Sequence, residues 1–476
     1  MRTPRRFKNS LKWLNFGAMS GAAKLLRRRL NRAAPIHCIQ RSLDQMSLPK
    51  LIEIVPLTTP IHAEIVVPGS KSITNRALIL AALAHGETTL RGALWSEDTQ
   101  VMVECLQKIG FAARVSLDPE ESCNRTIAVT GLGGRLPRSG TIVQPLGLFV
   151  GNAGTAARFL AALVCLGNGV YRLHGTPRMH DRPQASLLQA LRQLGYRIDS
   201  PDDRLPAVIH GTGPRQAGCR VGVEESSQFA SALLLCARKG HWQIEVVGEN
   251  NGTEMPYVEM TERLIAAFPE KGGSFQIEPD SSSASYFWAA AWLLNRGTKD
   301  RASSLTVRNW PSSAWQIDSQ FPAYLKSSMP NTLSRRNELG DSIMTAIVLA
   351  PFDSHPIQFT GLGRLRLQEC DRVSALAAEL DRCGAKVSES REGLEVFPSE
   401  LRGAEIETYN DHRMAMCFAI LGLKVSGIKI KNPACVKKTF PNFFQKLTEP
   451  PPLGLGATIL DGVSGQPLNV SDLFAE

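Results

Sequence analysis

One local pattern occurs six times along the chain and constrains its fold more than any other feature of the sequence. A short polar or glycine-rich turn is followed by an Ala/Leu-rich segment with little polar face, and often by another glycine. A helix that is apolar nearly all round must be buried. The pattern therefore predicts an α/β fold in which six repeated units place helices beneath sheets. The copies are SKSITNRALILAALAHG from Ser70, GNAGTAARFLAALVCLGNG from Gly151, ESSQFASALLLCARKG from Glu225, DSSSASYFWAAAWLLNRG from Asp280, GDSIMTAIVLA from Gly340 and NDHRMAMCFAILGLKVSG from Asn410.

A second kind of helix is expected between several copies. Segments 97–109, 184–194, 259–267 and 372–383 have the amphipathic spacing of surface helices. Short alternating strands follow them, as in LGYRI at 194–198 and CGAKV at 383–387. The repeated unit is thus predicted as strand, buried helix, strand, amphipathic helix, strands. The first buried helix is expected to end at Gly86.

The polar starts of the buried helices are candidate anion sites. A helix start carries free backbone N–H groups and the positive end of the helix dipole. In the first copy, Lys71, Ser72 and Arg76 stand at such a start, and Ser72 and Arg76 share a face. If the six starts converge, they form one pocket for anions. The alternative is that they are six separate caps that only begin helices.

Six cationic residues lie in or just beyond turn-like segments rather than on the outer faces of amphipathic helices. Any one of them is ordinarily a solvated surface charge, but together they indicate a substrate with several negative charges. They are Lys71, Arg158, Arg178, Arg372, Arg413 and Lys438.

Two carboxylates are candidates for acid and base chemistry. Asp341 stands at the start of the fifth buried helix and Glu369 precedes Arg372 by three residues. The alternatives are that Asp341 is an N-cap and that Glu369 and Asp371 are a capping pair. Neighbouring cations would lower both pKa values and favour the base role. No Walker loop, no G-x-G-x-x-G after a strand and no metal-ligand spacing occurs, so His412 is expected to be structural.

The charge of the chain is unevenly distributed. The formal net charge is +10, but residues 1–43 contain eleven Lys and Arg and no Asp or Glu, so the rest is near neutral. This distribution argues against a nucleic-acid surface spread over the fold.

The basic extension 1–48 is interpreted as an organelle-transit peptide, as sequence upstream of a true start at Met46, or as a basic arm. The chain is expected in the cytoplasm, or in a plastid or other organelle if residues 1–45 are a transit peptide. From Pro450 onward the chain is expected to be a loose tail.

Eight ordered motifs resemble the 5-enolpyruvylshikimate-3-phosphate (EPSP) synthases, an enolpyruvyl transferase family, over residues 50–447. They are PGSKSITNR, GNAGTAAR, PRMHDRP, SSQF, DSSSASYF, ECDR, YNDHRMAM and KKTFP. The resemblance implies an inside-out α/β barrel architecture with two domains, each of three βαβαββ repeats, joined by a double-stranded hinge. One domain would be residues 70–278; the other would join 49–69 to 279–447, and 448–476 would be the flexible tail. The chain would cross between domains at Pro68-Gly69.

The resemblance also implies the reaction. The enolpyruvyl group of phosphoenolpyruvate would move to the 5-hydroxyl of shikimate 3-phosphate with release of phosphate. No metal or organic cofactor would take part. The resemblance further implies a monomeric transferase of chorismate and aromatic amino acid biosynthesis, in a family that is the target of the inhibitor glyphosate. No nucleic acid or membrane partner is implied. Shikimate 3-phosphate would contact Lys71, Ser72, Arg76, Ser226, Ser227, Gln228, Tyr257, Asp341 and Gln368. Phosphoenolpyruvate would contact Lys71, Asn152, Gly154, Arg178, Gln228, Arg372, Arg413 and Lys438. Proton transfer would fall to Lys71, Asp341 and Glu369.

The sequence departs from that family's pattern at several positions. Gln368 stands where Lys is usual and Arg364 where Asn is usual, so Arg364 and Arg366 are candidates to supply the missing charge. Glu254 replaces a phosphate-contacting Ser, and Phe159 replaces a Pro. Segment 305–340 is short, which predicts a reduced fifth repeat. Three other functions stay open: a catalytically degenerate anion-binding paralogue, the related transferase acting on UDP-N-acetylglucosamine, and a nucleic-acid or membrane module built on the basic tail.

Overall fold

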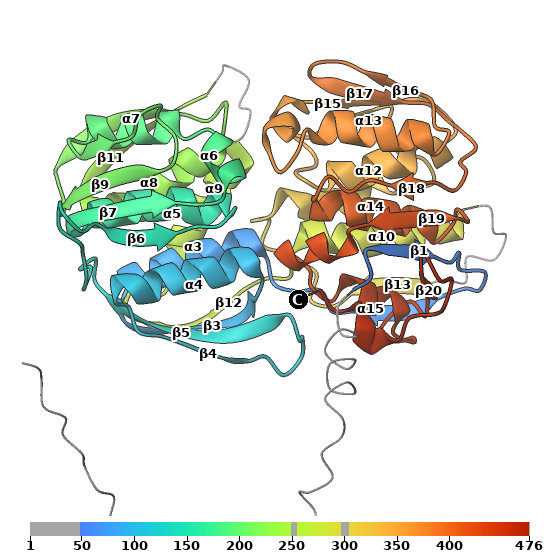
Figure 1. The fold of residues 1–476 in the computed structure, drawn as a ribbon, viewed down its shortest axis with the longest axis horizontal. Coiled ribbons are helices and arrows are strands. Elements are labelled where there is room, and N and C mark those ends of the chain that lie inside the picture. The colour runs from blue at the N-terminus through green and yellow to red at the C-terminus, as the bar shows by residue number, and fades with distance from the viewer. Residues whose placement is uncertain (1–47, 249–254, 297–303, 476) are drawn as a thin grey trace, which may run out of the picture. The chain divides into compact units, whose positions relative to one another are not determined.

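The computed structural model describes residues 48–248, 255–296 and 304–475 (Figure 1). The basic extension and Glu254 lie outside the described residues. Within these ranges, no helix is long and apolar enough to cross a membrane.

The strands between residues 85 and 276 form three sheets that mix parallel and antiparallel pairs. The first has the order β12 (Gly273–Gln276), β3 (His85–Leu94), β5 (Asn124–Leu132) and β4 (Ala113–Leu117). The second has the order β6 (Leu146–Phe149), β7 (Asn168–His174), β9 (Ala207–Thr212) and β8 (Arg197–Asp199). The third pairs β10 (Ala217–Gly222) with β11 (Trp242–Val247) in parallel. In each four-stranded sheet the first pair is parallel and the others are antiparallel.

The remaining described strands form three further sheets. One has the order β18 (Glu405–Ile406), β19 (Ile428–Lys431), β1 (Leu51–Ile54) and β20 (Ile459–Asp461). Another has the order β14 (Thr332–Ser334), β15 (Ile357–Thr360), β17 (Gly393–Val396) and β16 (Val387–Glu389). The third pairs β13 (Ser304–Val307) with β2 (His62–Ile65) in parallel. The fold is therefore mixed α/β.

All six predicted buried helices are present. They are α3 (Lys71–Leu83), α5 (Gly154–Cys165), α8 (Ser227–Gly240), α10 (Ser281–Asn295), α12 (Ile343–Leu349) and α14 (His412–Gly422). Every residue of α5 and of α12 is buried. The predicted end of the first helix was wrong, because α3 stops at Leu83 and Gly86 lies in β3 with a φ of 88°.

The amphipathic helices are also present. They are α4 (Glu97–Ile109), α7 (Ala185–Gln193), α9 (Met255–Ala267), which starts earlier than predicted, and α13 (Arg372–Arg382). Short helical segments complete the described elements: α6 (Pro177–Asp181), α11 (Phe321–Tyr324), α15 (Phe443–Thr448), η1 (Ile317–Gln320), η2 (Ala350–Phe352), η3 (Gly363–Leu367), η4 (Pro433–Lys438) and η5 (Val470–Leu473).

The buried apolar side chains form two separate clusters. The first, the 73–277 core, takes all its buried residues from that continuous stretch, and α3, α5 and α8 pack together in it. The second, the split core, joins residues 48–67 to residues 284–475, and α10, α12 and α14 pack together in it. Hydrophobic burial thus divides the described chain at two places, near residues 68–72 and 278–283.

Two chain segments pass side by side between these cores. Gly69 pairs with Pro279 in an isolated antiparallel bridge, the amide of Ser70 donates to the carbonyl of Glu278 at 2.8 Å, and the amide of Asp280 donates to the carbonyl of Pro68 at 2.9 Å. A Cβ atom on Gly69 would lie 1.9 Å from the carbonyl oxygen of Gly92. Only glycine fits this crossing without moving the backbone.

The expectation of a loose C-terminal tail was wrong. Strand β20 pairs antiparallel with β1, so that the red end of the chain lies beside its blue first strand in Figure 1. The buried side chains of this segment join the split core: Leu455, Ala457, Ile459, Leu473 and Ala475. Its proline and glycine content indicated disorder, but these apolar residues find partners in strands far away in the sequence.

Candidate active site

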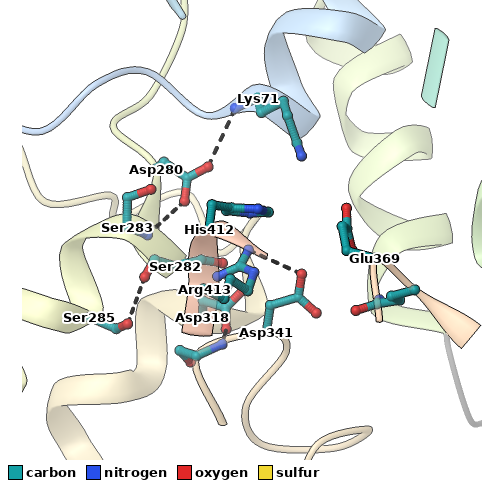
Figure 2. A network of polar contacts seen from close by, with 12 residues as sticks. Lys71, Asp280, Ser282, Ser283, Ser285, Asp318, Asp341, Glu369, His412 and Arg413 are labelled. Atoms are coloured by element: carbon teal, nitrogen blue, oxygen red, sulfur yellow. Dashed lines mark hydrogen bonds and ion pairs between the residues drawn. The ribbon is translucent and has the colours of Figure 1, made fainter. Parts of the chain in front are cut away.

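The starts of all six buried helices line one cavity of about 90 Å³. The predicted convergence is confirmed, and the alternative of six independent caps is wrong. Figure 2 shows part of this cavity, with Lys71, Asp341, Glu369 and His412 facing a common space. The helix starts contribute Lys71 and Ser72 of α3, Gly154 and Thr155 of α5, Ser227 and Gln228 of α8, Ser282 and Ser283 of α10, Asp341 ahead of α12, and His412 and Arg413 of α14.

Lys71 is held at the first turn of α3 by two acidic residues. Its Nζ atom lies 3.1 Å from Asp98 Oδ2, and its backbone amide donates to Asp280 Oδ2 at 3.4 Å (Figure 2). Asp98 lies in α4, in the 73–277 half of the chain, whereas Asp280 is the N-cap of α10, whose buried residues belong to the split core. Lys71 therefore stands where the two halves meet.

Asp341 lies between two arginines. Arg413 Nη2 is 3.1 Å from its Oδ2 atom and Arg335 Nη2 is 3.5 Å from its Oδ1 atom. Burial would raise the pKa of Asp341, but Arg413 and Arg335 outweigh it and lower the pKa to about 2. Asp341 is therefore a carboxylate at neutral pH. It is not the N-cap of α12, because that position belongs to Ser342.

Glu369 bridges two cations from different elements. Lys438 Nζ lies 2.9 Å from Oε1, and Arg372 Nη2 lies 2.9 Å from Oε2. Burial would raise the pKa of Glu369, but Lys438 and Arg372 hold it well below its ordinary value. Arg372 is fixed in turn by Asp411, the N-cap of α14, with Nε 2.6 Å from Oδ2. The alternative capping role belongs to Asp371, which accepts from the amide of Ser374.

Arg76 is buried and bonded to hydroxyl and carbonyl oxygens. It donates to Thr261 Oγ1 at 2.7 Å, to Ser231 Oγ at 3.0 Å and to the carbonyl of Ser72 at 3.0 Å. Burial lowers its pKa to about 10, and its guanidinium lies 5.3 Å from the centre of the Phe159 ring. The Phe159 ring thus stabilises the buried guanidinium of Arg76 through a cation–π contact.

A group of arginines lies behind Gly154 and Gln228. Arg158 donates to Gln228 Oε1 at 2.7 Å, and Arg182 donates to the carbonyl of Asn152 at 3.1 Å. A Cβ atom on Gly154 would lie 2.9 Å from Arg182 Nη2, so the glycine leaves room for this guanidinium. Arg182 lines the cavity, whereas Asn152 and Arg158 stand behind it.

The departures from the family pattern separate clearly in space. Arg364 lines the cavity and donates to Ser227 Oγ at 3.1 Å and Ser226 Oγ at 3.3 Å. Arg366 points away and pairs with Glu389 at 2.7 Å and with Asp371 at 3.0 Å. The side chain of Gln368 contacts Arg372, and its carbonyl accepts from Arg178 Nη2 at 3.0 Å.

His412 is buried at the start of α14 and lines the cavity. Burial, helped by the charge of Lys71, lowers its pKa well below the ordinary value, so the ring is neutral. Neither ring nitrogen has a hydrogen-bond partner among residues 48–248, 255–296 and 304–475. No cluster of three potential metal ligands occurs in those ranges either.

The sequence-predicted site residues lie together, though not all reach the cavity wall. Twelve of them line it: Lys71, Ser72, Arg76, Gly154, Ser227, Gln228, Tyr257, Asp341, Gln368, Glu369, Arg372 and Arg413. The other four stand directly behind a lining residue: Asn152, Arg178, Ser226 and Lys438. Sequence reasoning missed Asp98, Arg182, Asp318 and Arg335. Only Arg182 carried a signal, since it lies in the PRMHDRP motif.

A family model and curated relatives match most of the chain. A family model of EPSP synthase (3-phosphoshikimate 1-carboxyvinyltransferase) matches residues 55–321 and 334–447. A 3-phosphoshikimate 1-carboxyvinyltransferase from Opitutus terrae is 39% identical over 438 residues, which are 84% of this chain and 98% of that protein. The enzyme of the same name from Trichormus variabilis is 37% identical over 428 residues, covering 83% of this chain and 98% of that protein.

A solved structure of EPSP synthase from Acinetobacter baumannii has the same fold. It superposes with a TM-score of 0.68 at 20% sequence identity, covering 86% of this chain and 99% of that one. The fold is thus that of the enolpyruvyl transferases. The family match and the extent of the curated relatives identify the chain as a member of the EPSP synthase family, with 3-phosphoshikimate 1-carboxyvinyltransferase activity in the shikimate pathway.

Proposed function

We propose that phosphoenolpyruvate and shikimate 3-phosphate react in the cavity at the six helix starts, with Lys71, Asp341 and Glu369 as the proton-transfer groups. The observation that carries this assignment is that two ionised carboxylates, each held by two cations, share one cavity with Lys71. Both substrates carry a carboxylate and a phosphate, so bringing them together costs Coulomb energy that fixed cations and helix dipoles offset.

The start of α8 is the proposed binding surface for shikimate 3-phosphate. Ser226, Ser227 and Gln228 supply hydroxyl and amide groups there, and Ser72, Arg76 and Tyr257 stand beside them on α3 and α9. Asp341 would accept hydrogen bonds from the ring hydroxyls. Neutral donors combined with a few cations suit a small phosphorylated polyol.

The cations around Glu369 are the proposed binding surface for phosphoenolpyruvate. Arg372 and Lys438 already contact this carboxylate at 2.9 Å, and Arg413 contacts Asp341. Arg178 reaches the same region through the carbonyl of Gln368. A bound dianion would share these cations with Glu369. The pKa of Glu369 would then rise toward its ordinary value, which suits a group that must take up and release a proton.

The chemistry needs four balanced proton movements. The substrate hydroxyl loses its proton as its oxygen bonds to C2 of phosphoenolpyruvate, and the C3 methylene gains one, which gives a tetrahedral intermediate. The new methyl group then loses a proton as the C2–O bond to phosphate breaks, and the departing phosphate takes one up. Glu369 and Asp341 are placed to exchange protons at C3 and at the hydroxyl, and the Lys71 ammonium to stabilise the leaving phosphate.

Opening and closing of the two cores is part of the proposal. Ligand pockets usually enclose roughly 300–1,000 Å³, whereas this cavity encloses about 90 Å³. Substrates therefore need the 73–277 core and the split core to separate, with the paired segments at Gly69 and Pro279 as the hinge.

We assign the two predicted domains to these cores. Six βαβαββ units are the matching interpretation of the repeats. The reduced unit would be the fourth rather than the fifth, because the two-stranded β13-β2 sheet follows α10, whereas α12 lies between β14 and β15 of a four-stranded sheet.

Phosphate release with purified protein tests the assignment. Wild type should release phosphate only when both substrates are present, and Lys71→Met should lose both affinity and rate because Lys71 touches both halves. A wild-type protein that binds shikimate 3-phosphate by calorimetry but releases no phosphate would instead support the degenerate paralogue. A Lys71→Met variant with unchanged kinetics would remove this cavity from the reaction. A single peak at 52 kDa in size-exclusion light scattering would match the proposed monomer.

A further inference from the structure

Arg364 connects the two cores through the start of α8. It lies in η3, which the buried Leu362 and Leu365 anchor to the split core, whereas α8 belongs to the 73–277 core. Its Nη1 donates to Ser227 Oγ at 3.1 Å and its Nη2 donates to Ser226 Oγ at 3.3 Å. The two arms of one guanidinium thus contact two successive hydroxyls across the cavity.

These contacts orient the serine hydroxyls. A hydroxyl has two acceptor lone pairs and one donor hydrogen. Ser226 Oγ already accepts from the amide of Gln228 at 3.2 Å and from Arg364. With both lone pairs used, its O–H group is left to donate. Ser227 lines the cavity and likewise accepts from Arg364. The guanidinium and the hydroxyls therefore present donors in one place.

The surroundings of this donor group favour an anion. Arg182 lines the same cavity and Arg158 stands behind Gln228. Burial, followed by repulsion from Arg182, lowers the pKa of Arg364 to about 10, which still leaves it charged at neutral pH. The Nε atoms of Arg158 and Arg182 are buried and have no hydrogen-bond partner in the described part of the chain. A bound dianion would relieve repulsion among three guanidiniums.

Gln368 does not supply this charge. Its side chain is neutral and contacts Arg372. Arg366 is equally excluded, because Asp371, Glu389 and the carbonyl of Ser390 hold it outside. Arg364 is the residue of this segment whose charge enters the cavity beside the serines.

We propose that Arg364 is the cation that recognises the phosphate of shikimate 3-phosphate, and that it clamps this phosphate between the split core and the start of α8. The proposal rests on the assignment of the α8 surface to that substrate. Binding of the phosphate to both Arg364 and the α8 serines would therefore stabilise the arrangement in which the two cores are close together. It also explains how a chain with Gln at 368 keeps a charge for its phosphorylated substrate.

The test compares shikimate 3-phosphate with shikimate, which lacks the phosphate. Hydrogen bonds to charged groups contribute about 1.5–3 kcal/mol each, so Arg364→Asn should weaken shikimate 3-phosphate binding by about 10- to 150-fold in calorimetry. Shikimate binding and the KM for phosphoenolpyruvate should stay within about twofold. Arg364→Lys, which keeps the charge but loses one arm, should fall between wild type and Arg364→Asn. Thermal unfolding checks that each variant is folded.

Two further variants sharpen the test. Arg366→Asn removes an arginine from the same segment outside the cavity and should leave both affinities within about twofold. The double variant Arg364→Asn/Gln368→Lys places a new cation four residues along the chain. It should recover most of the lost affinity for shikimate 3-phosphate. Unchanged shikimate 3-phosphate binding in Arg364→Asn, or an equal loss for both ligands, would overturn the proposal. Failure of wild type to bind shikimate 3-phosphate would instead overturn the assignment of the α8 surface.

Discussion

Glu369 illustrates how single residues at this site are tuned by their neighbours. Two cations at 2.9 Å hold it as a carboxylate in the free protein. The same two cations would bind the anionic groups of phosphoenolpyruvate in the proposed reaction. Substrate binding and proton affinity at Glu369 are therefore linked through Arg372 and Lys438.

The Glu369→Gln variant should lose turnover much more than affinity. An amide keeps the shape and one acceptor oxygen but cannot exchange a proton, so we expect kcat to fall by about 100-fold or more while both KM values change only several-fold. Steady-state phosphate release measures this. Glu389→Gln, which removes an exposed carboxylate that pairs with Arg366, is the matched control and should keep wild-type kcat. Near-normal turnover in Glu369→Gln would exclude it from proton transfer.

The ion pairs of Asp341 predict a pH dependence of stability. Its folded-state pKa of about 2 lies below the unfolded value, so its contribution is present above about pH 4 and is lost as pH falls toward 2. Compared with Asp341→Asn, wild type should be more stable by about 2 kcal/mol at pH 6 and should lose about half of that difference by pH 3. Urea unfolding of both proteins measures it. A difference that stays constant down to pH 3 would contradict the ionised, paired carboxylate.

Sequence patterns predicted some site residues but not others, because the same residue type in the same local pattern can serve either a site or an ordinary helix. Lys71 and Arg413 could be predicted because they stand at the starts of apolar helices. Such helices are buried, so a charge at their start is not an ordinary solvated surface charge. Asp98 could not, because an acid in the first turn of an amphipathic helix is also the ordinary way to stabilise a helix dipole. Arg364 and Arg366 are two residues apart in one turn, and only the contacts of each side chain reveal which one enters the cavity.

At the scale of elements, the C-terminal segment is a structural part of the split core. Strand β20 pairs with β1, and the carbonyl of Pro452 accepts from the amide of Glu64 in β2 at 2.9 Å. The segment thus contacts two strands from the beginning of the described chain. Buried helices could be predicted from local composition, but this burial depends on partners about 400 residues away and leaves no local pattern.

Truncating one apolar side chain of this segment should destabilise the protein. Ile459 is fully buried, so Ile459→Ala should cost about 2–5 kcal/mol through lost burial and the cavity left behind. Leu453→Ala is the matched control, because Leu453 is 60% exposed, and it should change stability by about 0.5 kcal/mol or less. Chemical unfolding measures both. Equal effects would mean that the segment does not belong to the core in solution.

For the whole molecule, the arrangement predicts which parts of the chain activity requires. The cavity-lining residues lie between Ser70 and Thr439. Removing residues 1–46 should therefore leave kcat and both KM values within about twofold, although it removes all eleven cations of the basic extension. Removing residues 1–56 also deletes β1, which pairs with β19 and β20, and should yield unstable protein. A large kinetic loss in the shorter truncation would assign the extension a role in the reaction.

The split core also has a consequence for how the chain is made. The 73–277 core is continuous and can fold while synthesis proceeds, but β1 pairs with β19 through Leu51 and Lys431, about 380 residues later. At typical rates of about 5–20 residues per second, β1 waits for its partner for tens of seconds after it leaves the ribosome. Because β20 pairs with the other edge of β1, this core is completed only when the last residues emerge. A nascent chain that stalls before β13 and β19 are made would leave β1 and β2 without their partner strands, and their apolar residues would stay exposed.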